Sequence, residues 1–168
     1  ASVQPDFQGM PADIEIEFTL ARKAPNGACF TGITRTVTPL TFDGSDGQNQ
    51  VNAVITGNDV YQGIWPPNQY LNIYVCEEIG GAAGYTFKPS GNASSSAFGM
   101  YFNGIFLLHN YTGSIGTSDI YTSRTLTHEV GHWLNLNHTW GPNNNPGNAA
   151  SCSDDDNVQD TPLCIGVS

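Results

Sequence analysis

Hydrophobic and polar residues alternate from Asp13 to Leu20, and this period of two predicts a strand with one buried face. The largely apolar run at residues 70–76 predicts a second strand that is more deeply buried. Residues 104–111 predict a further strand, and residues 85–87 predict a short one. Pro25-Asn26-Gly27 predicts a turn near the start of the chain.

The period changes near Ser123. The apolar residues that follow recur at the spacing of one helix face, which predicts a helix from Ser123 to Leu134. Thr122 or Ser123 is expected to cap its start. Residues 42–58 are rich in Gly, Asp and Asn, and their pattern favours neither a helix nor a strand. After His138 the chain is rich in Pro, Asn and Gly, so we expect loop to its end.

These elements fit one domain. With 168 residues the chain is long enough to bury a hydrophobic core, and it contains no internal repeat. Strands followed by one well-marked helix indicate an α/β domain. The order of the strands in the sheet does not follow from periodicity.

The chain carries five Lys and Arg against fifteen Asp and Glu, a formal charge of −10. Nucleic acid and anionic membrane surfaces are therefore poor candidate partners, and no apolar run approaches the length that spans a membrane. A low content of charged residues, with many Gly, Asn, Ser and Thr, is typical of extracellular enzymes. No signal peptide is visible at the polar start at Ala1, so we expect a processed, mature form.

Four cysteines permit three full pairings, and the sequence does not choose among them: Cys29, Cys76, Cys152 and Cys164. Cys76 ends an apolar run, so we expect it to be buried. Cys152 and Cys164 flank an acidic segment, where they could form a disulfide bond with each other or with cysteines outside this chain.

The segment His128-Glu129-Val130-Gly131-His132 has the pattern H-E-x-x-H. On a helix, residues four apart lie on one face, one turn apart, so the two imidazoles could bind one zinc ion. Glu129 lies beside the first imidazole and is placed to act as general base on a water molecule rather than to bind the metal.

A catalytic zinc normally has three protein ligands and one open position. His138 follows His132 by six residues, and on a continuing helix it would point away from the other two. The chain must therefore reverse between them. Asn135 can make this turn, because Asn readily adopts the left-handed conformation that ends helices. The sequence thus predicts zinc bound by His128, His132 and His138.

Two other interpretations use the same residues. The bare pattern arises by chance in unrelated helices, and a thermolysin-type zinc peptidase would take a distant Glu as its third ligand. The position of His138 argues against both. The remaining histidine, His109, is predicted to lie in a strand and not to bind the metal.

The segment from His128 to His138 resembles the long zinc motif of the metzincins, with Asn135 where their pattern usually has Gly. Four further segments resemble the pappalysin family of metzincins, including its ulilysin-like microbial members: residues 32–36, 70–76, 139–141 and 155–162. The resemblance therefore extends from about Ile14 to Pro162.

This resemblance implies a secreted zinc endopeptidase with an α+β fold, in which a twisted mixed sheet lies above a cleft and the active-site helix lies behind it. In such enzymes an edge strand binds the protein or peptide substrate in extended form. Residues 105–111 are the candidate for that strand, and an ordinary strand within the sheet is the alternative.

Metzincins also have a methionine-containing turn after the third histidine, but the only methionines here are Met10 and Met100. Residues 1–168 are therefore expected to form a single metzincin-like catalytic domain. Its amino-terminal subdomain would extend to about His138, and residues 139–168 would begin a carboxy-terminal subdomain. We expect the remainder of that subdomain to be absent or to be a carboxy-terminal fragment of the same precursor.

Acidic residues crowd the segment after the zinc motif, and carboxylates so close together repel one another unless a cation joins them. The resemblance implies a structural calcium ion bound by Asp156, the Val158 carbonyl and Thr161, with Asp160 nearby. A solvated acidic loop is the alternative. At the level of function, the alternative to an enzyme is a calcium-stabilised, non-catalytic binding module with a relic zinc site.

Overall fold

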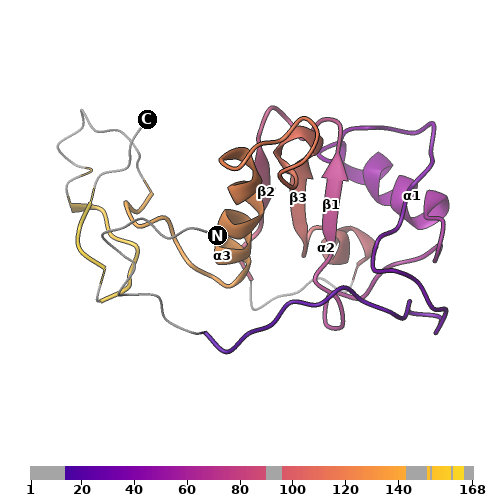
Figure 1. The fold of residues 1–168 in the computed structure, drawn as a ribbon, viewed down its shortest axis with the longest axis horizontal. Coiled ribbons are helices and arrows are strands. Elements are labelled where there is room, and N and C mark those ends of the chain that lie inside the picture. Colours follow the sequence, from indigo (N-terminus) through magenta and orange to yellow (C-terminus); the bar gives the residue numbers. More distant parts are fainter. Residues whose placement is uncertain (1–13, 90–95, 143–150, 152, 160, 165–168) are drawn as a thin grey trace.

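The computed structural model of the chain describes residues 14–89, 96–142, 151, 153–159 and 161–164. Figure 1 shows its regular elements, which follow one another in this order: α1 (Gly47–Gly57), β1 (Ile73–Cys76), β2 (Gly84–Thr86), α2 (Ala97–Tyr101), β3 (Ile105–Leu108), the 3₁₀ helices η2 (His109–Tyr111) and η3 (Thr122–Arg124), and α3 (Thr125–Trp133).

The three strands form one mixed sheet in the order β1-β3-β2. β1 pairs with β3 in parallel, with Ile73 opposite Ile105, and β2 pairs with β3 antiparallel, with Gly84 opposite Leu107. Because β3 is paired on both sides, the edges of this sheet belong to β1 and β2.

Helices cover both faces of the sheet. One face carries Tyr74, Tyr85 and Phe106, whose rings stack on one another within the main core, against α1 and α2. Complete burial of an aromatic side chain such as Phe106 contributes about 1.5–3 kcal/mol. The other face carries Gly84 and Leu107, and α3 packs there. Figure 1 shows α3 and α1 on opposite sides of the sheet, which is the α+β arrangement that we expected.

Helix α1 occupies the segment whose pattern was ambiguous. Val51 and Val54 lie three residues apart and are both buried, while the backbone amide of Asn49 donates to the Asp46 carbonyl at the start of the helix. The polar Asn52 lies between these apolar positions, so the helical period is short and weak in the sequence.

The strand predicted for residues 13–20 is wrong over the part that the structure describes. Residues 14–20 form no strand, and their four alternating apolar side chains are 50–64% exposed: Ile14, Ile16, Phe18 and Leu20. Alternation supplies an apolar face, but a strand also needs a hydrogen-bonded neighbour. No described residue provides that neighbour in a ladder. Asp13 lies outside the described residues.

The strand predicted for residues 70–76 is shorter and less buried than expected. β1 begins at Ile73, and Ile73 and Val75 remain exposed while Cys76 is buried. The reason is that β1 is an edge strand and α3 packs over β2 and β3 instead.

Three local predictions are confirmed with shifted ends. The turn at Pro25-Asn26-Gly27 is closed by the Gly27 amide, which donates to the Ala24 carbonyl at 2.8 Å. Residues 85–87 and 104–111 correspond to β2 and β3, although His109–Tyr111 form η2 instead of extending the strand. Across the described ranges, no helix is both long and apolar enough to cross a membrane.

Candidate functional site

Helix α3 is preceded by the 3₁₀ turn η3, which Asp119 caps. An Asp119 carboxylate oxygen accepts hydrogen bonds from the amides of Thr122 and Tyr121 at 2.8 and 2.7 Å, and these bonds lower the pKa of Asp119. The Thr122 hydroxyl accepts from the Asp119 amide at 2.8 Å, so the two residues cap each other. The prediction that Thr122 or Ser123 caps the helix is therefore wrong, because the chain begins its turn earlier, at Asp119.

Helix α3 ends at the point that the third histidine requires. Asn135 has a φ of 74°, in the left-handed region. The amide of Asn135 donates to the His132 carbonyl at 2.9 Å, and the amide of Leu136 donates to the Gly131 carbonyl at 3.0 Å. These two bonds define a Schellman motif, in which a left-handed residue reverses the chain. The predicted reversal at Asn135 is thus present.

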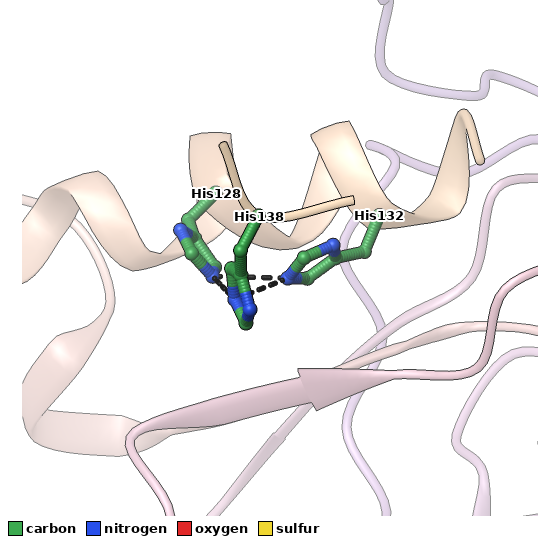
Figure 2. A group of neighbouring side chains, drawn as sticks. All are labelled: His128, His132 and His138. Atoms are coloured by element: carbon green, nitrogen blue, oxygen red, sulfur yellow. Dashed lines mark hydrogen bonds between the residues drawn. The ribbon is translucent and has the colours of Figure 1, made fainter. Parts of the chain in front are cut away.

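The reversal brings three imidazoles together. The Nε2 atoms of His128 and His132 are 3.1 Å apart, and the Nε2 atom of His138 lies 3.1 and 2.9 Å from them, respectively. Figure 2 shows the three rings pointing at one position, two from α3 and one from the segment that follows it. Among the described residues, these three histidines form the one group of His, Cys, Asp or Glu side chains that could hold a metal ion.

The donor set fits a tetrahedral metal ion. Bonds of about 2.0–2.1 Å in tetrahedral geometry separate ligand nitrogens by roughly 3.3 Å, close to the separations found here. Nδ1 of His132 lies 2.9 Å from the Leu136 carbonyl, which places the proton on Nδ1 and leaves Nε2 with a free lone pair. Burial lowers the pKa of both His128 and His138, and their neighbouring histidines lower it further, which favours the neutral form that binds a metal.

Glu129 is the buried acid of this helix, with a relative exposure of 5%. Burial raises the pKa of Glu129, and the opposing effect of His132 is smaller. A carboxylate with a raised pKa accepts a proton more readily than an ordinary one, which suits a general base.

A cleft of about 410 Å³ opens beside Glu129 and His128. Gly84 of β2 and Ala83 before it line one side of the cleft. The other side is lined by Tyr121, which precedes η3, by Arg124 of η3 and by Thr125 of α3. The sequence did not single out any of these five residues. Arg124 and Thr125 could have been suggested by their position one helical turn before His128 and Glu129, whereas the approach of β2 has no local signal.

The candidate for the substrate-binding edge strand, residues 105–111, is wrong. Residues Ile105–Leu108 form β3, which has β1 on one side and β2 on the other, so its hydrogen-bonding groups are already used. β2 is the edge strand next to α3, and it borders the cleft.

The acidic segment returns to the turn that carries His138. Asn137, the residue before His138, donates from its side-chain amide to the Asp156 carbonyl at 2.7 Å. Its side-chain oxygen accepts a hydrogen bond from Lys88. Asn137 thereby joins the acidic segment and the end of the sheet to the metal site.

Only part of the proposed calcium group is described. Asp156 is buried, and one of its carboxylate oxygens accepts from the Val158 amide at 2.9 Å. The Val158 carbonyl accepts from the Thr161 amide at 3.1 Å. These three residues therefore form one compact turn, while Asp160 lies outside the described residues.

The other candidate residues lie away from the triad. His109 is exposed in η2 and does not join the metal group. Cys76 is buried, as expected, and burial raises its pKa to about 11. Cys29, Cys76 and Cys164 are free thiols in the structure, and Cys152 lies outside the described residues.

Three histidines converge from a helix and the turn that follows it, and a buried glutamate lies beside them, between helix and sheet. This arrangement is typical of the metal centre of a peptidase. The sequence model of the family Peptidase_M43, described as "Pregnancy-associated plasma protein-A", matches residues 55–167. The chain belongs to this family, and the resemblance to the pappalysins is thereby confirmed.

Similar proteins from fungi carry related names. "Extracellular metalloprotease 1" of Coccidioides posadasii is 31% identical over 142 residues, which cover 83% of this chain and 45% of that protein. "Extracellular metalloprotease PODANS_2_14170" of Podospora anserina is 29% identical over 147 residues, which cover 86% of this chain and 45% of that protein.

A solved structure supports the fold independently. Mature mirolysin of Tannerella forsythia, in complex with a cleaved peptide, superposes with a TM-score of 0.71 at 33% identity. The match covers 98% of this chain and 57% of mirolysin. The chain thus spans about half the length of these relatives.

Proposed function

We propose that this chain is the metal-binding part of a zinc-dependent endopeptidase. One observation supports the proposal above all: three imidazole nitrogens meet within 3.1 Å of one another beside a buried glutamate in an open cleft. A relic site in a non-catalytic module would have no need for a buried acid, because burying an ionisable group destabilises the fold. Membership of a peptidase family favours the same function.

His128, His132 and His138 would hold the zinc ion through Nε2. Zinc at this position would polarise the scissile carbonyl and favour ionisation of a water molecule. The hydrogen bond from His132 Nδ1 to the Leu136 carbonyl fixes the orientation of one ligand. The Schellman turn at Asn135 presents His138 as the third.

Glu129 would act as the general base. Its carboxylate takes a proton from the attacking water and then delivers that proton to the leaving amine. Its burial against β2 keeps the side chain in one place beside the cleft.

The substrate would be a protein or peptide bound in extended form along β2. The outer edge of this strand faces away from β3, and residues Ala83 and Gly84 already border the cleft. An added antiparallel strand would form main-chain hydrogen bonds there and present its peptide bond toward the triad. Replacing Thr86 by Pro would remove a backbone donor from β2 and is expected to raise KM more than it lowers kcat.

Asp156, Val158, Asp160 and Thr161 would bind a structural calcium ion. The turn that joins Asp156 to Thr161 and the burial of the Asp156 carboxylate support this assignment, because a buried carboxylate needs a compensating partner. The hydrogen bond from Asn137 to Asp156 would let the calcium-bound segment stabilise the turn that carries His138.

Residues 1–168 would form one catalytic domain, with an amino-terminal subdomain to about His138 and the start of a carboxy-terminal subdomain in residues 139–168. Relatives about twice as long support a second subdomain that contributes to the substrate site. The names of the fungal relatives support secretion into the medium.

A metal and activity titration tests the proposal. The purified protein is depleted of metal, reloaded with zinc, and assayed on a quenched-fluorescence peptide and on casein. We expect one zinc per chain and turnover that depends on it. His138→Ala should bind zinc more weakly, whereas His109→Ala should behave as wild type. Equal zinc affinity in the His138 variant and wild type would refute the triad.

A further inference from the structure

Gly84, the first residue of β2, has a conformation that does not require glycine. Its φ is not positive, so a side chain would cause no backbone strain at this position. Its small size must therefore matter through the space around it.

That space is filled by helix α3. A Cβ atom built on Gly84 would lie 2.6 Å from Thr125 Cγ2 and 3.2 Å from Glu129 Cγ. A third neighbour, Leu107 Cδ2, would lie at 3.1 Å, but it is the flexible end of a side chain. Thr125 and Glu129 are four residues apart and so occupy the same face of α3. Both of them border the cleft.

Neither strand β2 nor Thr125 can move away freely. β2 is fixed to β3, since Gly84 is opposite Leu107 and the Leu108 amide donates to the Ala83 carbonyl at 3.0 Å. Thr125 is fixed from the other side by a 2.8 Å hydrogen bond from its hydroxyl to the Thr122 carbonyl. A methyl group at position 84 would therefore press the strand and the helix apart or push the Glu129 side chain aside.

We infer that Gly84 is a positioning residue for the peptidase reaction: its missing side chain lets β2 approach α3 closely enough to hold Glu129 in place. The inference rests on the proposed function, because it concerns where the general base is held. Glu129 Cγ is bonded directly to the carboxylate carbon, so a displacement of a few tenths of an ångström at Cγ moves the carboxylate as well. Misplacement of a catalytic group by about 1 Å reduces rates on the order of 10²-fold.

The first test replaces Gly84 by Ala in the zinc-loaded enzyme that contains this chain. We expect kcat to fall at least about 10-fold, while zinc content stays the same and KM changes little. A merely structural glycine would instead lower the melting temperature and leave kcat of the folded fraction unchanged. Gly131→Ala serves as the control for stability, because a Cβ there meets only Leu136 Cδ1 at 3.9 Å. It should not lower the melting temperature, since Ala favours a helix over Gly.

The second test is a compensating pair. Thr125→Ser removes the methyl group at 2.6 Å and keeps the hydroxyl that binds Thr122. The Gly84→Ala/Thr125→Ser variant should recover most of the kcat lost in Gly84→Ala, measured against Thr125→Ser alone. If Gly84→Ala does not fold, this double variant should fold with a kcat close to that of Thr125→Ser, and a folded double variant with a kcat well below that of Thr125→Ser would contradict the compensation.

A structural measurement separates this inference from the proposed function. In the zinc-free protein, the ¹³C resonance of the Glu129 carboxylate should shift in Gly84→Ala and return toward its original position in the double variant. An unchanged resonance, or full kcat in a folded Gly84→Ala enzyme, would overturn the positioning role. Absence of any turnover in the wild type would refute the proposed function alone, because the carboxylate resonance still tests where Glu129 is held.

Discussion

The backbone amide of Leu136 donates to the Gly131 carbonyl at 3.0 Å, and together with the bond from Asn135 to His132 it ends helix α3 between the second and third histidines. It can form because Asn135, the residue between the helix end and Leu136, has a φ of 74°. Position 135 therefore links backbone conformation to the geometry of the metal site.

Substitutions at Asn135 should weaken zinc binding more, the less readily the new residue adopts a positive φ. Asn135→Gly is expected to bind zinc as well as wild type, because glycine adopts this conformation without strain. Asn135→Val is expected to bind zinc at least about 10-fold more weakly, since a β-branched residue in the left-handed region is strained by on the order of 1–3 kcal/mol. Competition with a chromophoric zinc chelator measures both affinities.

Asn68→Val is the matched control for this series, because Asn68 is an exposed turn residue without positive φ. Its zinc affinity should equal that of wild type. Equal affinity in all three variants would show that the turn does not depend on residue 135.

Glu129→Gln should keep zinc and lose turnover by about 10²–10⁴-fold, the usual contribution of a positioned acid–base group. The amide has nearly the shape of the carboxylate but cannot accept the proton of the attacking water. Steady-state kinetics and metal analysis on the same preparation measure the two effects. Glu77→Gln, an exposed acid on the segment after β1, is the control and should keep full kcat. Turnover like that of wild type in Glu129→Gln would remove Glu129 from the mechanism.

The same substitution should stabilise the metal-free protein at neutral pH. Because burial raises the pKa of Glu129 above its ordinary value of 4.5, the folded protein holds this proton more tightly than the unfolded chain does. The contribution to stability is complete below pH 4.5 and is lost as pH rises through the folded pKa. Urea unfolding at neutral pH should therefore give a higher free energy of unfolding for Glu129→Gln than for wild type, and the difference should vanish at acidic pH.

The histidines should act in the opposite direction. The pKa values of His128 and His138 are lowered from the ordinary 6.5, so the unfolded chain binds protons more readily than the folded protein. Their contribution is present above pH 6.5 and is lost as pH falls through the folded pKa values. His128→Asn in the metal-free protein should flatten the loss of stability below pH 6.5, and an unchanged slope in urea unfolding would contradict the lowered pKa.

Removal of calcium should destabilise the protein without removing zinc. A calcium-selective chelator is expected to lower Tm by about 5 °C or more, because an ion at 100 times its Kd contributes about 2.7 kcal/mol. Asp156→Asn should abolish this response, whereas Asp155→Asn, which makes the same charge change at an exposed neighbour, should keep it. No change in the Tm of wild type on chelation would exclude the calcium ion.

The convergence of the three histidines could be predicted from the sequence because its geometry is local. Two histidines four residues apart share a helix face whatever the rest of the fold does, and the conformational preference of Asn135 acts on a single residue. The capping residue was misplaced because Asp119 and Thr122 bond to each other, so that the turn begins at Asp119, before the predicted start of the helix.

The sheet and the cleft could not be predicted, because they depend on pairing between distant segments. Alternation from Ile14 to Leu20 looks like a strand, yet this segment has no ladder partner among the described residues. The apolar residues of β3 fit a buried strand, but its central place in the sheet follows only from the pairing with both β1 and β2. Gly84 and Thr125 lie close together although they are 41 residues apart, and neither residue type indicates this contact in the sequence.

The hydrogen bond from Asn137 to the Asp156 carbonyl also has a consequence for biosynthesis. Asn137-His138-Thr139 is an acceptor sequence for N-linked glycans, which are attached to the side-chain amide nitrogen. In the folded chain that nitrogen already donates to Asp156 at 2.7 Å, so a glycosylating host could modify it only before folding. A sugar attached at that stage would keep the acidic segment from closing on the histidine turn, and glycosylated molecules should be recovered without zinc.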